Sequence, residues 1–454
     1  MKSKRIYLPI ETTKRELLSR MSFAIESAQK GWEPVFGSKS DFLNKIKYLK
    51  SGHYLGKSLQ PGNYKNYDYI KSFGNNISIF DEEGLFSFDE EFSNRRVGEK
   101  NFELIQNYFL WGKKNKEELL IRFKSIEDKL ILAGNQRIEL LKTPMKDYFF
   151  DESQKIKKKF GNFILVTTKF PKANFIKRPD LQDFVEHQIK KGWLYNDHLI
   201  KCAQDAHEHE KQNLLRLINF LKKFANLKKK EQIFIRPHPN EDYSTYENAF
   251  IKYDNIHVIK DHDNTNSWIL ACKFLIHFNC TTGLESFLLK KRAFNFMPFK
   301  NENVEYELLN QISEIIRNEE KLFEITEDFE NMIPNYEEKK QKLNEFIFNI
   351  GDKNFSNIVL DQLNKLENFG NNKDKFTASF YTYLLKLRVI IRNFVSLKKK
   401  SSFELKSLQK LKPYKKKEIY EIYESLLKKL GINKNNLYFK EILPRLYLIK
   451  KNEN

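Results

Sequence analysis

Short apolar segments alternate with segments of helical periodicity along most of the chain, and this alternation restricts the possible folds more than any other feature. Between the first two apolar segments, Lys14–Lys30 repeats apolar residues at the spacing of one helix face. Strands that alternate with helices are typical of a parallel sheet, so the sequence predicts an α/β fold. The first strands expected are Arg5–Pro9, Glu33–Phe36, Ile77–Phe80 and Leu130–Ala133.

A polar, lysine-rich stretch at about Lys142–Lys159 interrupts this alternation, which begins again afterwards. A chain of 454 residues is long enough for two or three domains. We therefore expect two Rossmann-type domains, residues 1–150 and residues 151–368, that face a central cleft in which a ligand binds. The strands expected in the second domain are Phe163–Thr168, Gln232–Arg236, Ile256–Ile259, Phe274–Phe278 and Ala293–Phe296.

The formal net charge of +20 is concentrated near the end of the chain. Residues 371–454 contain 21 Lys and Arg against 7 Asp and Glu, a net charge of +14, which leaves +6 for residues 1–370. Aromatic and aliphatic residues recur at helical spacing from Phe376 to Val395, among lysines and arginines. The sequence thus predicts a basic helical extension, residues 369–454, that either contacts an anionic membrane surface or packs on the main domains.

Several classes of protein are excluded or disfavoured. The 3 cysteines include no CxxC pair, which excludes a zinc ribbon or a disulfide framework. No apolar run approaches the ~18 residues of a spanning helix, so we expect a cytoplasmic protein, peripheral on the inner face of the plasma membrane. There is no GxGxxG motif and no metal-binding spacing, and we expect no cofactor and no metal.

An acidic turn, Asp81-Glu82-Glu83-Gly84, directly follows one of the expected strands. The glycine permits a sharp turn that lets a carboxylate project from the edge of the sheet. Such a carboxylate is suited to remove a proton from an acceptor hydroxyl, provided that burial or a neighbouring acid raises its pKa. Acidic turns are also common on protein surfaces, so the pattern leaves both interpretations open.

Two further motifs follow expected strands of the second domain. In Arg236-Pro237-His238-Pro239, the two prolines restrict the backbone around an imidazole that, with the arginine, suits a phosphate oxygen. Asn279-Cys280-Thr281-Thr282-Gly283-Leu284-Glu285-Ser286 places hydroxyls and a glycine at a helix start, which favours an anion site. The structural alternatives are a rigid surface loop for the first motif, and a capping box of Thr282 with Glu285 for the second.

The chain resembles the bacterial surface carbohydrate biosynthesis protein family over about residues 4–350. Its carboxylate-glycine, His-Pro and paired-hydroxyl motifs are also similar to those of bacterial sialyltransferases, polysialyltransferases and Kdo transferases. The resemblance implies a GT-B fold and a CMP-activated acidic sugar as donor, used without a metal ion. The segments that carry it are Tyr7–Lys39, Ser78–Phe86, Ala133–Leu141, Arg236–Pro239 and Asn279–Ser286.

Site residues follow from this resemblance motif by motif. The carboxylate pair before the glycine falls on Glu82 and Glu83, with Glu82 at the base position and Asp81 as an additional acid. His238 matches the histidine that contacts the donor phosphate. The expected CMP-donor residues are Arg236, His238, Thr281, Thr282, Gly283 and Glu285, where the two threonines replace a pair of serines and Glu285 is assigned to the ribose. Glu11 and Arg15 are expected on the acceptor side.

The sequence therefore predicts a metal-independent glycosyltransferase that moves an acidic sugar (Kdo or a nonulosonic acid) from CMP to a cell-surface glycan. Glu82 would act as the base, and the residues around His238 would stabilise the departing CMP phosphate. One alternative is a CDP-glycerol or CDP-ribitol phosphotransferase of the teichoic-acid type. The alternative from a different class, a non-catalytic RNA or polyanion binder, is disfavoured because the tail lacks a stacking platform, and we expect no nucleic-acid partner.

Overall fold

The computed structural model describes residues 4–85, 96–175, 181–190, 194–260, 264–301, 305–328, 335–366, 416–443 and 445–452. These residues form two compact units, each built around its own sheet. The first unit contains the described residues up to Met145 together with those from Asn344 onward, and the second runs from Lys146 to Leu343.

The sheet of the first unit has eight strands among the described residues, in the order β13-β14-β2-β1-β3-β4-β5-β6. Neighbours from β2 to β6 are parallel, whereas β14 is antiparallel to both β2 and β13. The strands are β1 (Arg5–Ile10), β2 (Glu33–Ser38), β3 (His53–Gly56), β4 (Asn76–Phe80), β5 (Asn107–Leu110), β6 (Leu130–Leu132), β13 (Leu437–Leu443) and β14 (Leu446–Lys451).

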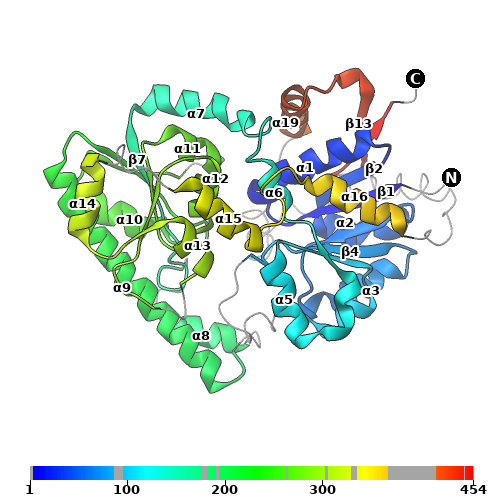
Figure 1. Cartoon of the computed structure of the whole chain (residues 1–454), viewed down its shortest axis with the longest axis horizontal. Helices are drawn as coiled ribbons and strands as arrows, with labels where there is room; N and C mark the ends of the chain where they lie inside the picture. The colour runs from blue at the N-terminus through cyan, green and yellow to red at the C-terminus, as the bar shows by residue number, and fades with distance from the viewer. Residues whose placement is uncertain are drawn as a thin grey trace, which may run out of the picture. The chain divides into compact units, whose positions relative to one another are not determined.

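Helices pack around this sheet (Figure 1). They are α1 (Thr13–Gln29), α2 (Lys39–Lys45), α3 (Tyr64–Lys71), α5 (Lys113–Arg122), α6 (Gln136–Glu139), α16 (Phe355–Lys365) and α19 (Lys416–Lys429). Short 3-10 turns cover Ile46–Tyr48, Pro61–Asn63, Glu99–Glu103, Lys124–Lys129 and Lys434–Asn436. Every residue of β1 is buried, as expected for a strand of a parallel sheet with both faces covered.

The second unit has a six-stranded parallel sheet within the described residues, in the order β12-β11-β10-β7-β8-β9. Its strands are β7 (Phe163–Thr167), β8 (Gln232–Arg236), β9 (Ile256–Val258), β10 (Leu275–His277), β11 (Ala293–Phe296) and β12 (Glu314–Ile316). Its helices are α7 (Asp147–Phe160), α8 (Leu181–Lys190), α9 (Asp197–Leu227), α10 (Tyr243–Phe250), α11 (Thr265–Ala271), α12 (Thr281–Leu288), α13 (Glu307–Ile312), α14 (Glu319–Asp328) and α15 (Tyr336–Phe346).

The predicted α/β class with two Rossmann-type sheets is confirmed. The C-terminal part differs from the predicted helical extension, because helix α19 is followed by the hairpin β13–β14. Strand β14 extends the first sheet by pairing with β2, and Tyr447 stacks on Phe36 with ring centroids 5.5 Å apart. The short apolar runs Leu437–Phe439 and Leu446–Ile449 carry this signal, which the high lysine content obscures.

Residues 344–366 also differ from the expected division, which counted them with the second domain. In the structure the ring of Phe355 packs edge-on against Phe80, 5.0 Å between centroids, and against Phe23, 6.0 Å. These contacts join helix α16 to the core of the first unit. The predicted amphipathic helix Phe376–Val395 lies outside the described residues.

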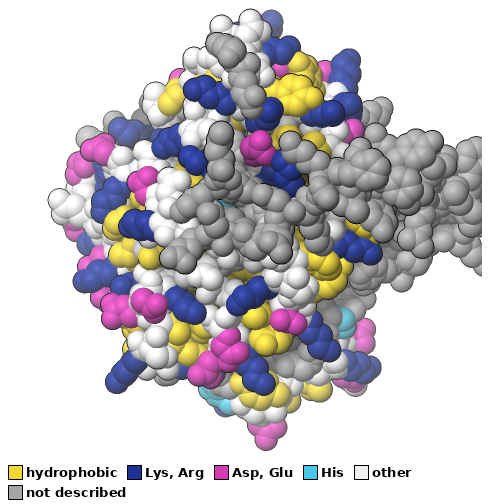
Figure 2. Space-filling model, turned by 90° about the vertical axis from the view of Figure 1, so that its right-hand side faces the viewer, with side chains coloured by type: hydrophobic (Ala, Val, Ile, Leu, Met, Phe, Trp, Pro, Cys, Tyr) yellow, Lys and Arg dark blue, Asp and Glu magenta, His cyan; other side chains and the backbone are white. Residues whose placement is uncertain are grey.

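On the face drawn in Figure 2, basic side chains are interspersed with acidic ones and with small hydrophobic areas. Among the described residues, no helix is both long enough and apolar enough to cross a membrane. The predicted contact with a membrane surface stays a prediction.

Candidate functional site

The sequence motifs of the first unit gather at the carboxyl edge of its sheet, because parallel strands all end on the same side. Asp81, Glu82 and Glu83 follow β4, Glu11 follows β1 and Lys57 follows β3. Hydrogen bonds tie these loops together: the indole nitrogen of Trp111 and the side-chain nitrogen of Asn135 both donate to the carbonyl oxygen of Asp81. The structure thus brings the acidic turn and the predicted acceptor-side residues to one edge.

Asp81 is a buried acid held by its neighbours. Its Oδ2 accepts a hydrogen bond from the Tyr108 hydroxyl at 2.9 Å, and its Oδ1 lies 3.3 Å from Nη2 of Arg96. Burial raises the pKa of Asp81. A Cβ on Gly84 would stand 1.9 Å from Asp81 Oδ2, so any other residue there would displace the Asp81 carboxylate. Asp81 therefore stabilises the conformation of the turn through buried contacts.

Glu82 forms a buried ion pair with Arg20 of helix α1. Nη2 of Arg20 lies 2.6 Å from Oε1 of Glu82, and the arginine side chain is 0% exposed. Burial alone would raise the pKa of Glu82, but the positive charges of Arg20 and Lys57 outweigh it and lower that pKa. Glu82 is consequently an ionised and largely enclosed carboxylate, whereas a general base works best with a pKa near the working pH.

Glu83 is the accessible member of the acidic turn. Its side chain is 56% exposed, and its carboxylate lies 3.9 Å from Nη2 of Arg96. The backbone nitrogen of Glu83 donates to Oδ1 of Asp81 at 3.2 Å, which fixes the orientation of the turn. Of the three acids, Glu83 is therefore the one that a substrate reaches most easily.

The predicted acceptor-side residues lie directly beside this turn. Arg15 donates a hydrogen bond from Nη2 to the carbonyl oxygen of Glu82, at 3.3 Å. Glu11 shares Lys57 with Glu16: the lysine nitrogen lies 3.1 Å from Glu11 Oε2 and 2.6 Å from Glu16 Oε1. Lys57 belongs to a segment, GHYLGKS, that is one residue short of a phosphate-binding loop. Its role in the structure is to pair with these two carboxylates.

The motifs of the second unit meet in the same way at the carboxyl edge of the second sheet. Thr168 and Lys169 follow β7, His238 follows β8, and Asn279 and Thr281 follow β10. In the sheet order β7 lies between β8 and β10. The structure therefore brings together both of the predicted donor motifs and adds the end of β7 between them.

A buried carboxylate, Glu241, fixes these loops. Its oxygens accept hydrogen bonds from the Thr168 hydroxyl at 3.0 Å and from the backbone nitrogens of Phe170 and His238 at 3.1 Å. The Tyr246 hydroxyl donates to the same carboxylate. Burial raises the pKa of Glu241 to about 7. Through its hydrogen bond with the backbone nitrogen of His238, Glu241 fixes the His-Pro loop.

The ring of His238 has a defined orientation. Its Nδ1 accepts a hydrogen bond from the backbone nitrogen of Asn240 at 3.2 Å. In the neutral ring the proton is therefore carried by Nε2, which can donate to an anion. Arg236 is half-buried, and its charge acts on the nearby Tyr243 hydroxyl. The prolines and Glu241 together hold the imidazole at the edge of the sheet.

Helix α12 begins at Thr281, with Cys280 as its N-cap residue. The capping-box alternative for Thr282 and Glu285 is thus not what the structure has. The Thr282 hydroxyl lies 2.7 Å from the Thr167 hydroxyl and ties α12 to strand β7. Thr282 is buried, whereas Thr281 is partly exposed. Of the predicted pair, Thr281 is the hydroxyl more accessible to a phosphate at the helix start.

Gly283 and Glu285 occupy different environments on the same helix. A Cβ on Gly283 would stand 2.5 Å from the imidazole of His277, so the glycine lets α12 start directly over that ring. Burial lowers the pKa of His277 to about 3, which keeps the ring neutral. Glu285 is half-buried, one turn after Thr281. Gly283 therefore acts through close packing, and the ribose contact of Glu285 stays a prediction.

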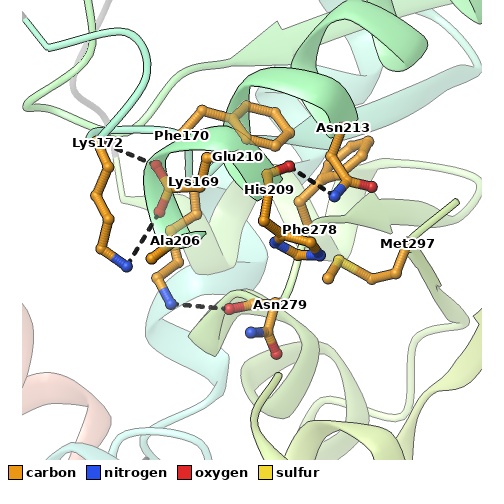
Figure 3. A pocket seen from close by; sticks show the side chains of 10 residues that line it. All are labelled: Lys169, Phe170, Lys172, Ala206, His209, Glu210, Asn213, Phe278, Asn279 and Met297. Atoms are coloured by element: carbon orange, nitrogen blue, oxygen red, sulfur yellow. Dashed lines mark hydrogen bonds and ion pairs between the residues drawn. The ribbon is translucent and has the colours of Figure 1, made fainter. Parts of the chain in front are cut away.

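Lys169 is a residue of this edge that the sequence motifs did not indicate. Its amine donates to the carbonyl oxygen of Asn279 at 3.2 Å and lies 3.9 Å from the centroid of the Tyr306 ring. Burial lowers its pKa to about 8. Figure 3 shows Lys169 pointing toward Asn279, just before α12. A signal for it exists in the sequence, because Lys169 comes directly after two threonines that end an apolar strand.

A pocket adjoins Lys169 in the second unit (Figure 3). Glu210 of α9 lines the pocket, and its carboxylate accepts a hydrogen bond from the backbone nitrogen of Lys172 at 2.7 Å. His209 contacts the carbonyl oxygen of Phe299 at 2.8 Å. The residues that line the pocket are Lys169, Phe170, Lys172, Ala206, His209, Glu210, Asn213, Phe278, Asn279 and Met297. Within the described part of the chain, no group of three or more His, Cys, Asp or Glu is arranged to hold a metal ion.

No protein-family model matches the sequence, and no curated protein matches it significantly. Solved structures do resemble it. A variant of the wall teichoic acid polymerase TagF has 11% sequence identity and a TM-score of 0.51, covering 80% of this chain and 88% of that one. A protein of Listeria monocytogenes assigned as a UDP-N-acetylglucosamine 2-epimerase has 13% identity and a TM-score of 0.51, covering 80% and 96%.

Another TagF variant, in a structure soaked with CDPG, has 11% identity and a TM-score of 0.50 and covers 80% of this chain and 89% of that one. At sequence identities this low, the similarity to these structures is evidence of a shared fold alone. The fold is of the GT-B type.

Proposed function

We propose that this protein is a GT-B glycosyltransferase that moves an acidic sugar, Kdo or a nonulosonic acid, from a CMP donor to a cell-surface glycan. The observation that carries the proposal is a set of side chains suited to bind a phosphate, which lie at the carboxyl edge of the second sheet. Lys169, His238 and Thr281 follow the neighbouring strands β7, β8 and β10 there, and Thr281 is the first residue of α12. The motif resemblance to CMP-sugar transferases adds the donor class.

The chemistry of these residues suits a departing CMP. The amine of Lys169 and Nε2 of His238 donate to phosphate oxygens, and the helix start contributes backbone N–H groups. Arg236 and Thr281 supply a further charge and a hydroxyl. Because these donors are fixed by Glu241 and by the Thr167–Thr282 contact, they stabilise the charge that develops on the phosphate without rearrangement.

For the acceptor hydroxyl we propose Glu83 as the base, in place of Glu82. The reason is access: the Glu83 side chain is 56% exposed, whereas Glu82 is enclosed and paired with Arg20. Glu82 then orients the turn, and Asp81 supports it from within. A predicted contact of the C-terminal extension with a membrane would bring the enzyme to lipid-linked acceptors.

A second candidate is a CDP-glycerol or CDP-ribitol phosphotransferase. It is favoured by the similarity of fold to TagF, one structure of which was soaked with CDPG. The same phosphate ligands would serve a CDP-linked donor.

A donor screen tests the proposal. The full chain is incubated with CMP-Kdo, CMP-nonulosonates, CDP-glycerol or UDP-N-acetylglucosamine, each with and without a surface-glycan acceptor, and acceptor-dependent release of CMP, CDP or UDP is measured. We expect CMP release from an acidic-sugar donor, abolished in His238→Ala and retained in His198→Ala, an exposed histidine of α9. Release of CMP from CDP-glycerol alone would replace the first candidate with the second.

A further inference from the structure

Lysines gather at the amino edge of the second sheet, opposite the edge that carries the donor motifs. Strands β7, β8 and β9 are parallel neighbours, so the segments that lead into them lie at one edge. These segments are residues 157–162, 227–231 and 251–255. They contain seven lysines (residues 157–159, 228–230 and 252) against two acids, Glu231 and Asp254.

Printed contacts join the three segments into one surface. The side-chain nitrogen of buried Asn255 donates to the carbonyl oxygens of Lys228 at 3.3 Å and Glu231 at 3.2 Å, which ties residues 251–255 to residues 227–231. Phe160 packs against Phe234 of β8 with 4.8 Å between ring centroids, which holds residues 157–162 beside the same strand. We call residues 157–162, 227–231 and 251–255 together the amino-edge surface.

Two aliphatic side chains project from the amino-edge surface. Leu227 is 64% exposed and Ile251 is 79% exposed, and each directly precedes a lysine in the sequence. Among the described residues of the second unit, they are the two most exposed large hydrophobic side chains. Exposed apolar residues that are grouped and bordered by charge mark an interaction site, whereas single scattered ones do not.

The ordinary structural role of lysines at this place accounts for only part of the pattern. The three segments follow the ends of α7, α9 and α10, where the helix dipole favours cations. Lys228 also pairs with Glu327. Neither effect requires Leu227 and Ile251 to be exposed. Lys229, Lys230 and Lys252 are themselves exposed and form no ion pair within the described part of the chain.

We propose that the amino-edge surface binds an anionic phospholipid membrane. The lysines pair with headgroup phosphates, and Leu227 and Ile251 enter the boundary between headgroups and acyl chains. Lipid is favoured over nucleic acid as the partner because the exposed apolar residues are aliphatic, whereas single-stranded bases stack on aromatic side chains. This inference goes beyond the proposed function, does not depend on the donor, and uses none of residues 369–454.

Co-sedimentation of the full chain with vesicles tests the surface. The vesicles contain phosphatidylcholine alone or phosphatidylcholine with phosphatidylglycerol in a ratio of about 2:1, at about 0.1 M salt. We expect the wild type to bind the anionic vesicles. Each lysine near such a membrane contributes roughly fivefold to partitioning, so the double variant Lys229→Glu/Lys230→Glu should bind about 25-fold more weakly or worse. Leu227→Ser/Ile251→Ser should lose about tenfold or more.

A matched control separates the surface from net charge and from the rest of the chain. Lys201→Glu/Lys211→Glu makes the same change of charge at two exposed positions in the first half of α9, and should bind within about twofold of the wild type. Residues 369–454 are present in every variant, so a difference among them is not due to that segment. The substituted side chains are exposed, and thermal unfolding should show equal stability for all the proteins.

Lysine acetylation locates the contact without any variant. Brief treatment with an acetylating reagent, followed by peptide mass spectrometry, should show Lys229, Lys230 and Lys252 protected by anionic vesicles, while Lys201 and Lys211 stay reactive. Equal binding of both surface variants and the wild type, or the absence of protection, would overturn the inference. Binding of the wild type to single-stranded RNA but to neither kind of vesicle would overturn it as well.

Discussion

The side-chain amine of Lys169 donates a hydrogen bond to the carbonyl oxygen of Asn279, with 3.2 Å between the two atoms. This contact places a cation at the end of the loop that leads into α12. Its pKa of about 8 means that the amine changes charge within the range in which enzymes are assayed.

The affinity for CMP should therefore depend on pH through Lys169. Below about pH 8 the amine is protonated and attracts the phosphate, so CMP binding weakens as the pH rises through 8 toward 9.5. Calorimetric titrations over this range measure the change. Lys169→Arg should keep the affinity and lose this pH dependence, and Lys169→Met should bind weakly throughout. An unaltered pH profile in Lys169→Arg would exclude the lysine as its source.

Glu83→Gln should lower turnover about 10²–10⁴-fold and leave CMP affinity within about twofold, because the amide cannot take the acceptor proton. Steady-state kinetics with the donor found in the screen provide the measurement. Glu82→Gln is the informative comparison. It leaves buried Arg20 without its charge partner and should destabilise the fold by about 3–5 kcal/mol. A fully stable Glu82→Gln protein without activity would return the base role to Glu82.

The stability of the second unit should decrease between pH 4.5 and 7 because of Glu241. Its folded pKa is raised from 4.5 to about 7, so the folded state binds the proton more tightly than the unfolded chain does. The resulting stabilisation is complete below pH 4.5 and lost as the pH rises through 7, a difference of about 3 kcal/mol. Denaturant unfolding of wild type and Glu241→Gln at pH 5 and pH 8 checks this. Glu247→Gln, on the same helix as Tyr246, is the control and should follow wild type.

Gly134→Ala should destabilise the first unit by several kcal/mol more than Gly31→Ala. Both glycines have a left-handed φ, +80° and +78°, so the backbone strain of about 1 kcal/mol is common to them. Only Gly134 faces Asn349, whereas a Cβ on Gly31 meets nothing within 4 Å. Thermal unfolding of the two variants isolates the contact. Equal melting temperatures would show that the Asn349 side chain moves aside at little cost when a Cβ is added at Gly134.

Periodicity in the sequence predicted nine of the fourteen strands of the described residues, because most buried parallel strands are short and continuously apolar. Gln232–Arg236 and Ala293–Phe296 coincide with β8 and β11. Strands β3 and β5 were not predicted, since each has only four residues and contains polar or glycine positions. The hairpin β13–β14 was missed because its partner, β2, is far away in the sequence.

The sequence motifs predicted which residues lie at the carboxyl edges of the two sheets, but they did not predict the ion pairs and hydrogen bonds that hold those residues. Spacing identified Glu82 and His238, yet the charge state of Glu82 depends on Arg20, which lies 62 positions away. Glu241 likewise depends on a partner that is distant in the sequence, because Thr168, which donates to its carboxylate, lies 73 positions away. Such partners are set by packing between elements, and no local pattern reports them. The sequence could therefore propose three carboxylates but not distinguish among them.

The pairing of β14 with β2 has a consequence for synthesis of the chain. β2 precedes the whole second unit in the sequence and β14 follows it, so the edge of β2 has no partner while the second unit emerges from the ribosome. An open strand edge is a template for wrong pairing. Nascent chains that are stalled or truncated before Leu446–Lys451 should then be the forms most prone to aggregate and most dependent on chaperones.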